Sequence, residues 1–173
     1  MTKPDLGCLS ERHLLLFGTI VQIFARYELL IQEIMAAVAG CDAAAVLLLT
    51  RTLDFNGKRL ALLDLLRHRT VPADRYDRIT AFLAGARTLT PLRDDIVHCA
   101  WIPGEASDSI QPNWILRIPS SVKPLRGEGY VEREDEEVAY TIEDLDDAID
   151  MLSTNYKAFL AYLREVKLVR ENP

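Results

Sequence analysis

Between residues 93 and 98 the chain gathers an arginine, two acidic residues and a histidine. Arg93 offers planar, bidentate donors to a phosphate, and the His98 side chain titrates near neutral pH without perturbation. Asp94 lies four residues before His98, so in a helix Asp94 can orient the imidazole and favour its protonated form. Arg93 lies about 140° around the axis from His98, so those two point apart. These residue types suit proton transfer beside a phosphate.

A structural interpretation of the same residues stays open, in which Arg93, Asp94 and His98 form a polar cluster at a helix end that ties helices to a sheet. Metal and cofactor chemistry is not predicted. The three cysteines and three histidines show no zinc-site spacing, and no cysteine pair forms a CxxC. An odd number of unpaired cysteines fits a reducing cytoplasm.

Length and composition predict one domain over residues 1–173, with 49% hydrophobic and 27% charged residues as in soluble proteins. The stretch from Leu14 to Ala25 is apolar, but Gln22, Arg26 and Glu28 come too soon for a membrane span. No small-residue cleavage site follows it, so a signal peptide is not expected either. The prediction is a cytoplasmic protein without a membrane partner.

The charge is unevenly distributed around a formal net value of −6. Residues 51–93 carry nine Lys and Arg against four Asp and Glu, whereas residues 128–150 carry one Arg against eleven acids. The basic stretch could face a phosphate-bearing partner, or the two stretches could face one another within or between subunits. Both interpretations stay open.

Apolar residues at helical spacing predict long helices near 10–39, 54–69, 73–98 and 142–166, with a short helix at 43–50. Gly40 is placed to end the first helix, and Asp42, Asp54 and Thr141 to cap the next ones. In the third helix Leu60, Leu63 and Leu66 are expected to define the buried side. Pro91 either kinks the helix before the motif or restarts it with Thr90 as the cap.

Glu28 interrupts the apolar stripe of the first helix, between Phe24 and Ile31. A buried carboxylate needs a cationic partner, so we predict that Glu28 pairs with Arg93 or its neighbours. The alternative is a residue at the edge of the stripe that reaches solvent. Gly57-Lys58 is not a phosphate-binding loop, because the first glycine and the Ser/Thr are missing, and Lys58 is expected on the surface.

Four of the eight prolines fall between residues 103 and 124, where short alternating segments replace the helical pattern. Asn113–Ile118 and Glu137–Tyr140 are predicted strands, with Ala100–Ile102 as a third candidate. The predicted fold is therefore mainly α, an up-and-down helical bundle with a small antiparallel β insertion at about 100–140 before the last helix.

The arrangement Arg93-Asp94-x-x-x-His98, within Leu89–Trp101, resembles the signature of the HEPN superfamily, and the order of helices resembles HEPN-like domains that insert a hairpin after the motif. The resemblance implies a metal-independent endoribonuclease with Arg93, Asp94 and His98 as catalytic residues, built as a homodimer around one cleft. It also implies RNA as substrate, a possible protein antitoxin or other partner, and a toxin–antitoxin or defence setting. The alternative is a catalytically inactive HEPN-like module that binds a protein or a nucleotide. Asp94 stands where many active members have Asn.

Overall fold

The computed structural model describes residues 7–113 and 139–169, and this part of the chain is mainly helical with a small two-stranded antiparallel sheet. The elements in chain order are α1 (Glu11–Ala39), α2 (Ala43–Thr50), α3 (Phe55–His68), α4 (Ala73–Arg87), α5 (Thr90–His98), β1 (Ala100–Pro103), β2 (Ile110–Asn113) and α6 (Ile142–Glu165).

The ends of the helices follow local chemistry. Ser10 caps α1 by accepting from the backbone N–H of His13, and Gly40 ends that helix with a left-handed φ of 69°. Asp42 and Asp54 accept from backbone N–H groups in the first turns of α2 and α3. Thr141 and Asp144 cap one another at the start of α6. The predicted caps are therefore confirmed.

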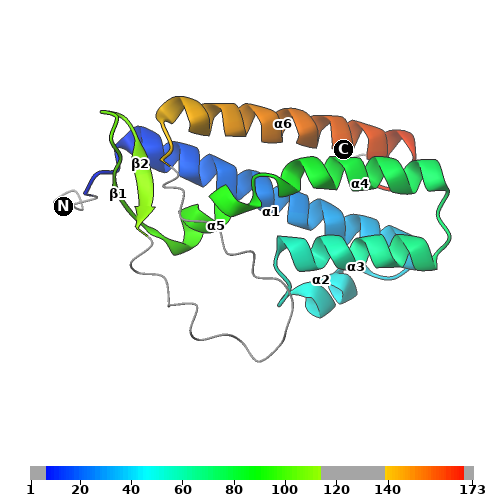
Figure 1. The fold of residues 1–173 in the computed structure, drawn as a ribbon. Helices are drawn as coiled ribbons and strands as arrows, with labels where there is room; N and C mark the ends of the chain where they lie inside the picture. Colours follow the sequence, from blue (N-terminus) through cyan, green and yellow to red (C-terminus); the bar gives the residue numbers. More distant parts are fainter. Residues whose placement is uncertain (1–6, 114–138, 170–173) are drawn as a thin grey trace.

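Four long helices form the bundle, with α1 packed between α3 and α6, and α4 contacting both of those helices (Figure 1). In that view α1, α3 and α6 run in the same direction along the bundle, and α4 runs against them (Figure 1). The short α2 lies beside α1, and α5 continues from α4 toward the hairpin (Figure 1). This arrangement brings the middle of α1, the start of α3 and Arg93 of α5 together.

The core is one cluster of apolar side chains from five of the described helices, all except α2, and from β2. The largest fully buried side chains in it are Tyr27, Phe24, Phe55, Phe159, Ile20, Ile31, Ile34, Leu62, Leu66, Ile79, Leu83 and Ile110. On α3 the prediction was wrong for one of its three leucines. Leu60 is exposed, and Leu62 is fully buried instead. Leu63 and Leu66 are buried as expected. The side of α3 that meets α1 is set by the docking angle of the two helices, which the leucine pattern alone leaves open.

The predicted helix at 73–98 is divided into two by residues 88 and 89. α4 ends at Arg87, and α5 restarts at Thr90 with Pro91 in its first turn. Restart is therefore the correct alternative, but Leu89 and not Thr90 is the N-cap residue. Proline has no N–H to donate to a preceding turn, so it fits the beginning of a helix better than its interior.

The sheet is a hairpin in which β1 pairs antiparallel with β2, with Trp101 opposite Pro112. The strand expected at Ala100–Ile102 is confirmed, whereas β2 lies earlier than the strand expected at Asn113–Ile118. Ile110 also forms an isolated bridge to Tyr140. Residues 114–118 and 137–138 of the predicted strands lie outside the described residues. The hairpin covers the beginning of α1 through Trp101, whose ring lies 4.7 Å from that of Phe17.

α1 is long and apolar enough to cross a membrane by length and composition, with a mean hydropathy of 1.7 over its most apolar window. In the bundle α3 and α6 pack along it, and Ile20, Ile31 and Ile34 are fully buried there. This placement is compatible with the core helix of a soluble protein.

Candidate functional site

Arg93 lies on the side of α5 that faces α1, where it meets Glu28. Its Nη2 atom is 3.8 Å from Oε1 of Glu28, and its side chain is 22% exposed. The predicted pairing of Glu28 with Arg93 is thus confirmed. The carboxylate in the apolar stripe is a half-buried group with cationic partners, because burying it alone would cost too much free energy.

Lys58 is the site residue that the sequence interpretation missed, because it was expected on the surface. It is only 7% exposed, and its ammonium group bonds Oε2 of Glu28. Lys58 lies three residues after Phe55 and four before Leu62, both fully buried, so it belongs to the inner face of α3. That spacing, together with an unpaired carboxylate on α1, is the signal that could have identified it.

Asp94 bonds the arginine beside it. Its Oδ1 atom accepts from Nη1 of Arg93 at 2.8 Å. The expected hydrogen bond between His98 and Asp94 is not formed within the part of the chain that the structure describes. Pairing with Arg93 compensates the charge of Asp94, which would otherwise repel a phosphate.

Glu28, Lys58, Arg93 and Asp94 therefore form one network of two cations and two anions from α1, α3 and α5. The network has no net charge, so it orients Arg93 without making a strongly positive surface. Nε of Arg93 is buried and has no hydrogen-bond partner among the described residues. A guanidinium carries five donors, and the hydrogen bond of Arg93 to Asp94 uses Nη1, so donors on its Nη atoms, and not the buried Nε, remain for a ligand.

His98 occupies the last position of α5 and is exposed. Its side chain makes no hydrogen bond or ion pair with any described residue. Val97 beside it is also exposed, at 46%. Arg93 and His98 thus diverge around the helix as their spacing predicted: the arginine turns toward the bundle and the histidine toward solvent.

Asp95, to which no role was assigned from the sequence, is buried at 1% exposure. Its Oδ2 atom accepts from the hydroxyl of Tyr140 at 3.4 Å, and its Oδ1 atom lies 4.0 Å from Sγ of Cys99. The residue ties α5 to the segment that enters α6. Asp95 therefore fills the structural role that was considered for the polar cluster at the end of the helix.

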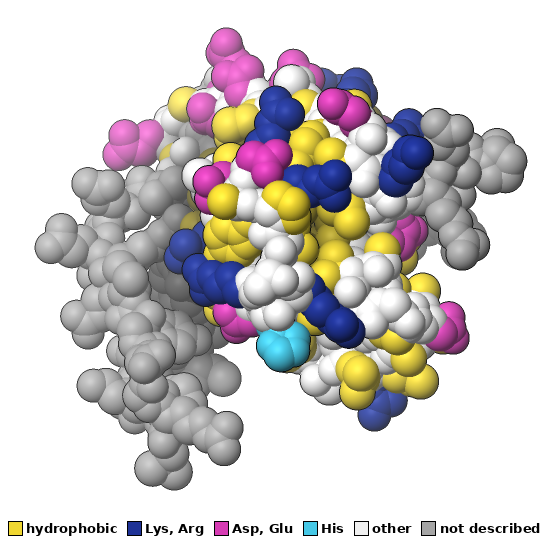
Figure 2. Space-filling view, turned by 90° about the vertical axis from the view of Figure 1, so that its right-hand side faces the viewer, with side chains coloured by type: hydrophobic (Ala, Val, Ile, Leu, Met, Phe, Trp, Pro, Cys, Tyr) yellow, Lys and Arg dark blue, Asp and Glu magenta, His cyan; other side chains and the backbone are white. Residues whose placement is uncertain are grey.

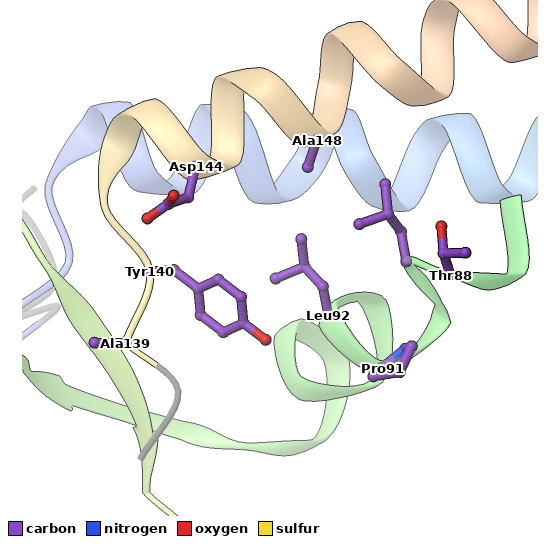
Figure 3. A pocket seen from close by; sticks show the side chains of 8 residues that line it. Thr88, Pro91, Leu92, Ala139, Tyr140, Asp144 and Ala148 are labelled. Carbon is purple, nitrogen blue, oxygen red and sulfur yellow. The ribbon is translucent and has the colours of Figure 1, made fainter. Parts of the chain in front are cut away.

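A shallow pocket of about 300 Å³ lies on the other side of α5, between the α4–α5 junction and the start of α6. Leu92 and Pro91 form one wall, and the ring of Tyr140 crosses the floor with its hydroxyl directed at α5 (Figure 3). The charged group at its edge is Asp144. An acidic, mainly apolar pocket of this size does not suit a phosphate group.

Most cations of the basic stretch 51–93 have partners inside the chain. Arg67 lies 5.2 Å from the ring centre of Tyr76, and Arg78 lies 5.1 Å from that of Tyr162. Arg69 donates to the carbonyl of Ala39, at the end of α1. Figure 2 views the end of the bundle where α1, α3 and α6 end and α4 begins, and there Lys and Arg side chains lie among hydrophobic and acidic ones.

The acidic stretch 128–150 is described only from residue 139 onward. Within that part Asp146 pairs with Arg12 of α1, through two hydrogen bonds of 2.7 and 2.8 Å. Asp144 is engaged with Thr141. The described acids therefore do not neutralise the basic stretch.

From its place near the amino terminus, His13 would most simply be a surface residue, but the structure shows that it is buried. The residue is 4% exposed, because the hairpin covers the first turn of α1. Its Nδ1 atom bonds Ser10, and its Nε2 atom lies 3.3 Å from the carbonyl oxygen of Asp108. His13 is a structural residue that joins the helix cap to the hairpin.

Among residues 7–113 and 139–169, no group of three or more His, Cys, Asp or Glu side chains is placed to hold a metal ion. No family model matches the chain, and comparisons with curated proteins and with solved structures give no significant match.

Proposed function

We propose that this protein is a cytoplasmic, metal-independent endoribonuclease of HEPN type that acts as a homodimer. The observation that carries the proposal is the arrangement on α5. Arg93 is oriented by Glu28 and Asp94 with donors to spare, and His98 is exposed at the end of the same short helix. Arg93 can bind a phosphate, and His98 can exchange protons near neutral pH.

The proposed reaction is attack of an RNA 2′-hydroxyl on the adjacent phosphorus. A base takes the proton of the 2′-hydroxyl, the new O–P bond forms, and the bond to the 5′-oxygen breaks. An acid returns a proton to that 5′-oxygen, so the products are a 2′,3′-cyclic phosphate and a 5′-hydroxyl end. Arg93 stabilises the charge that grows on the phosphorane oxygens.

One histidine cannot be base and acid in the same step, so the mechanism needs two copies of His98. A two-fold dimer with α5 at its axis supplies them, because each contact is then made twice. The exposed face of α5 supports this placement, since Val97 beside His98 offers an apolar contact. Light scattering at micromolar concentration should give a dimer. A monomer would remove the mechanism.

The decisive experiment is incubation of the purified chain with mixed RNA in excess EDTA, alongside the His98→Ala variant. We expect cleavage by the wild type, cyclic-phosphate ends on the products, and a loss of activity in the variant. The variant should unfold at the same temperature as the wild type, because His98 is exposed and lacks partners among the described residues. Equal cleavage by both proteins would point to a contaminating nuclease and end the proposal.

A second candidate is a catalytically inactive HEPN-like module that binds a protein partner such as an antitoxin. The exposed leucines of α2 favour it, because Leu47, Leu48 and Leu49 are 52, 64 and 80% exposed on one short helix. A nucleotide-binding module is less well supported, since the described pocket is apolar and acidic. Absence of cleavage by a folded, dimeric wild type would select the inactive module.

A further inference from the structure

Arg59 of α3 and Arg87 of α4 belong to the same end of two packed helices, and neither side chain has an acidic partner among the described residues. Arg59 is in the second turn of α3, and Arg87 is the last residue of α4. The two helices are packed together in opposite directions (Figure 1), which brings the beginning of α3 beside the end of α4. Like charges placed side by side repel each other, so the arrangement needs a reason.

Arg59 is held in a fixed orientation. Its Nε and Nη2 atoms both donate to Oδ1 of Asn56, at 3.1 and 3.0 Å. Its Nη1 atom makes no hydrogen bond with the described residues. Burial, and then the neighbouring charge of Arg87, lower the pKa of Arg59. A fixed guanidinium with one unused edge is the geometry that binds an oxyanion.

Arg87 is exposed, and its side chain makes no hydrogen bond or ion pair with any described residue. A cation in the last turn of a helix is stabilised by the helix dipole, and this accounts for Arg87 by itself. It does not account for Arg59, which lies near the beginning of its helix, where a positive charge is unfavourable. An anion between the two arginines would stabilise both.

Both arginines are close in sequence to residues of the network around Arg93. Arg59 follows Lys58, which bonds Glu28, and Arg87 precedes Arg93 by six residues across the α4–α5 junction. The network around Arg93 has no net charge, so attraction of an RNA strand must come from other cations. Backbone phosphates are contacted mainly by Arg and Lys, and such contacts hold a strand in position.

We propose that Arg59 and Arg87 together bind a backbone phosphate of the RNA strand, next to the phosphate that is cleaved. This inference rests on the proposed ribonuclease function and specifies its substrate class. The substrate is then an RNA strand that extends beyond the scissile phosphate along the α3–α4 surface. A single nucleotide lacks that second phosphate and binds weakly.

The test uses the full chain and a short fluorescent oligouridylate with 2′-O-methyl groups, which cannot be cleaved by 2′-hydroxyl attack. Fluorescence anisotropy is measured in EDTA, between about 50 and 200 mM KCl. The double variant Arg59→Gln, Arg87→Gln should bind about tenfold more weakly at the lowest salt. The slope of log affinity against log salt should fall by roughly 0.7 for each phosphate that the variant no longer neutralises.

The matched control is Arg26→Gln, Arg164→Gln. These exposed arginines come from α1 and α6 and lie beside Tyr156, where Glu33 is also close. The control changes the net charge by the same amount at a different surface. We expect its affinity and salt slope to stay near the wild-type values.

An equal loss in both double variants, no loss in the Arg59 and Arg87 variant, or no binding by the wild type would overturn the inference. Cleavage is scored separately on unmodified RNA. Salt-dependent binding through Arg59 and Arg87 without any cleavage would remove the ribonuclease and retain the phosphate site. Cleavage that is unchanged when both arginines are replaced would retain the ribonuclease and remove the phosphate site.

Discussion

Arg93 and His98 belong to the same nine-residue helix, yet their surroundings are opposite. Arg93 faces the bundle, where Glu28 and Asp94 surround its guanidinium and Lys58 completes the network. His98 ends the helix in solvent, without a partner among the described residues. The fold of one chain therefore positions the Arg93 side chain but leaves the His98 side chain without a contact that would orient it.

The difference separates two requirements of the proposed site. Ordering a long, flexible arginine side chain costs conformational entropy. In this bundle the side chain is already ordered when the chain folds, so binding of a ligand does not carry that cost again. The histidine must be completed from outside, by RNA or by a second copy of the chain. Variants at the two positions should therefore differ in how they divide their effects between activity and stability.

The largest expected effect is on catalysis. His98→Ala should lower RNA cleavage by about 10²- to 10⁴-fold, the range for losing a general acid or base, with no change in thermal unfolding. Arg93→Ala should lower cleavage and also the unfolding temperature, because Glu28 loses one of its two cationic neighbours. Activity assays and calorimetry on both variants measure the two effects.

Arg93→Lys is the useful control for this comparison, since it keeps the charge and removes the planar fork. We expect it to recover the stability lost in Arg93→Ala better than the activity. Should His98→Ala destabilise the fold as much as Arg93→Ala does, the contrast between an inner and an outer motif residue would be incorrect.

A smaller effect is expected at the network itself. Glu28→Gln leaves Lys58 nearly buried with no full counter-charge, so it should cost about 2 kcal/mol of unfolding free energy, below the roughly 3–5 kcal/mol of a fully buried pair because Glu28 is partly exposed. Chemical denaturation measures this cost. The double variant Glu28→Gln, Lys58→Met should cost less than the sum of the two single changes, since each single change strands the other charge.

Additive costs in that double variant would show that Glu28 and Lys58 act independently. Exposed pairs supply the comparison. Breaking the pair between Arg12 and Asp146, whose side chains are 50 and 43% exposed, should cost well under about 1 kcal/mol. The contrast measures what burial adds to an ion pair in this bundle.

A comparably small effect is expected at the start of α6, outside the network around Arg93. Hydrogen bonds from Thr141 hold the pKa of Asp144 below its usual value. The stabilisation from this carboxylate is therefore complete above the unfolded pKa, near about 3.9, and is lost as the pH falls through the folded pKa. Thr141→Ala should cost about 1 kcal/mol at neutral pH.

In urea titrations at several pH values, the difference between Thr141→Ala and the wild type should shrink below about pH 3.9. A difference that stays constant with pH would mean that the hydroxyl caps α6 without involving Asp144. RNA cleavage should be unchanged by this variant, because the cap is not part of the motif.

The sequence alone determined where most of the helices begin and end, but left open whether the helix at 73–98 is kinked or divided at Pro91. Capping by Asp42, Asp54 and Thr141 and the left-handed turn at Gly40 involve residues a few positions apart, so they are legible without a tertiary structure. The divergence of Arg93 and His98 follows from helix geometry alone. The pairing of Glu28 was predictable because a carboxylate in an apolar stripe requires a cation.

Only the tertiary structure decided which face each helix turns inward. The burial of Lys58 in place of a surface position, the choice of Leu62 over Leu60, and the covering of His13 by the hairpin depend on docking angles between distant segments. The approach of Arg59 to Arg87 depends on the opposite directions of α3 and α4. These are contacts between residues far apart in the chain, and no local pattern specifies them.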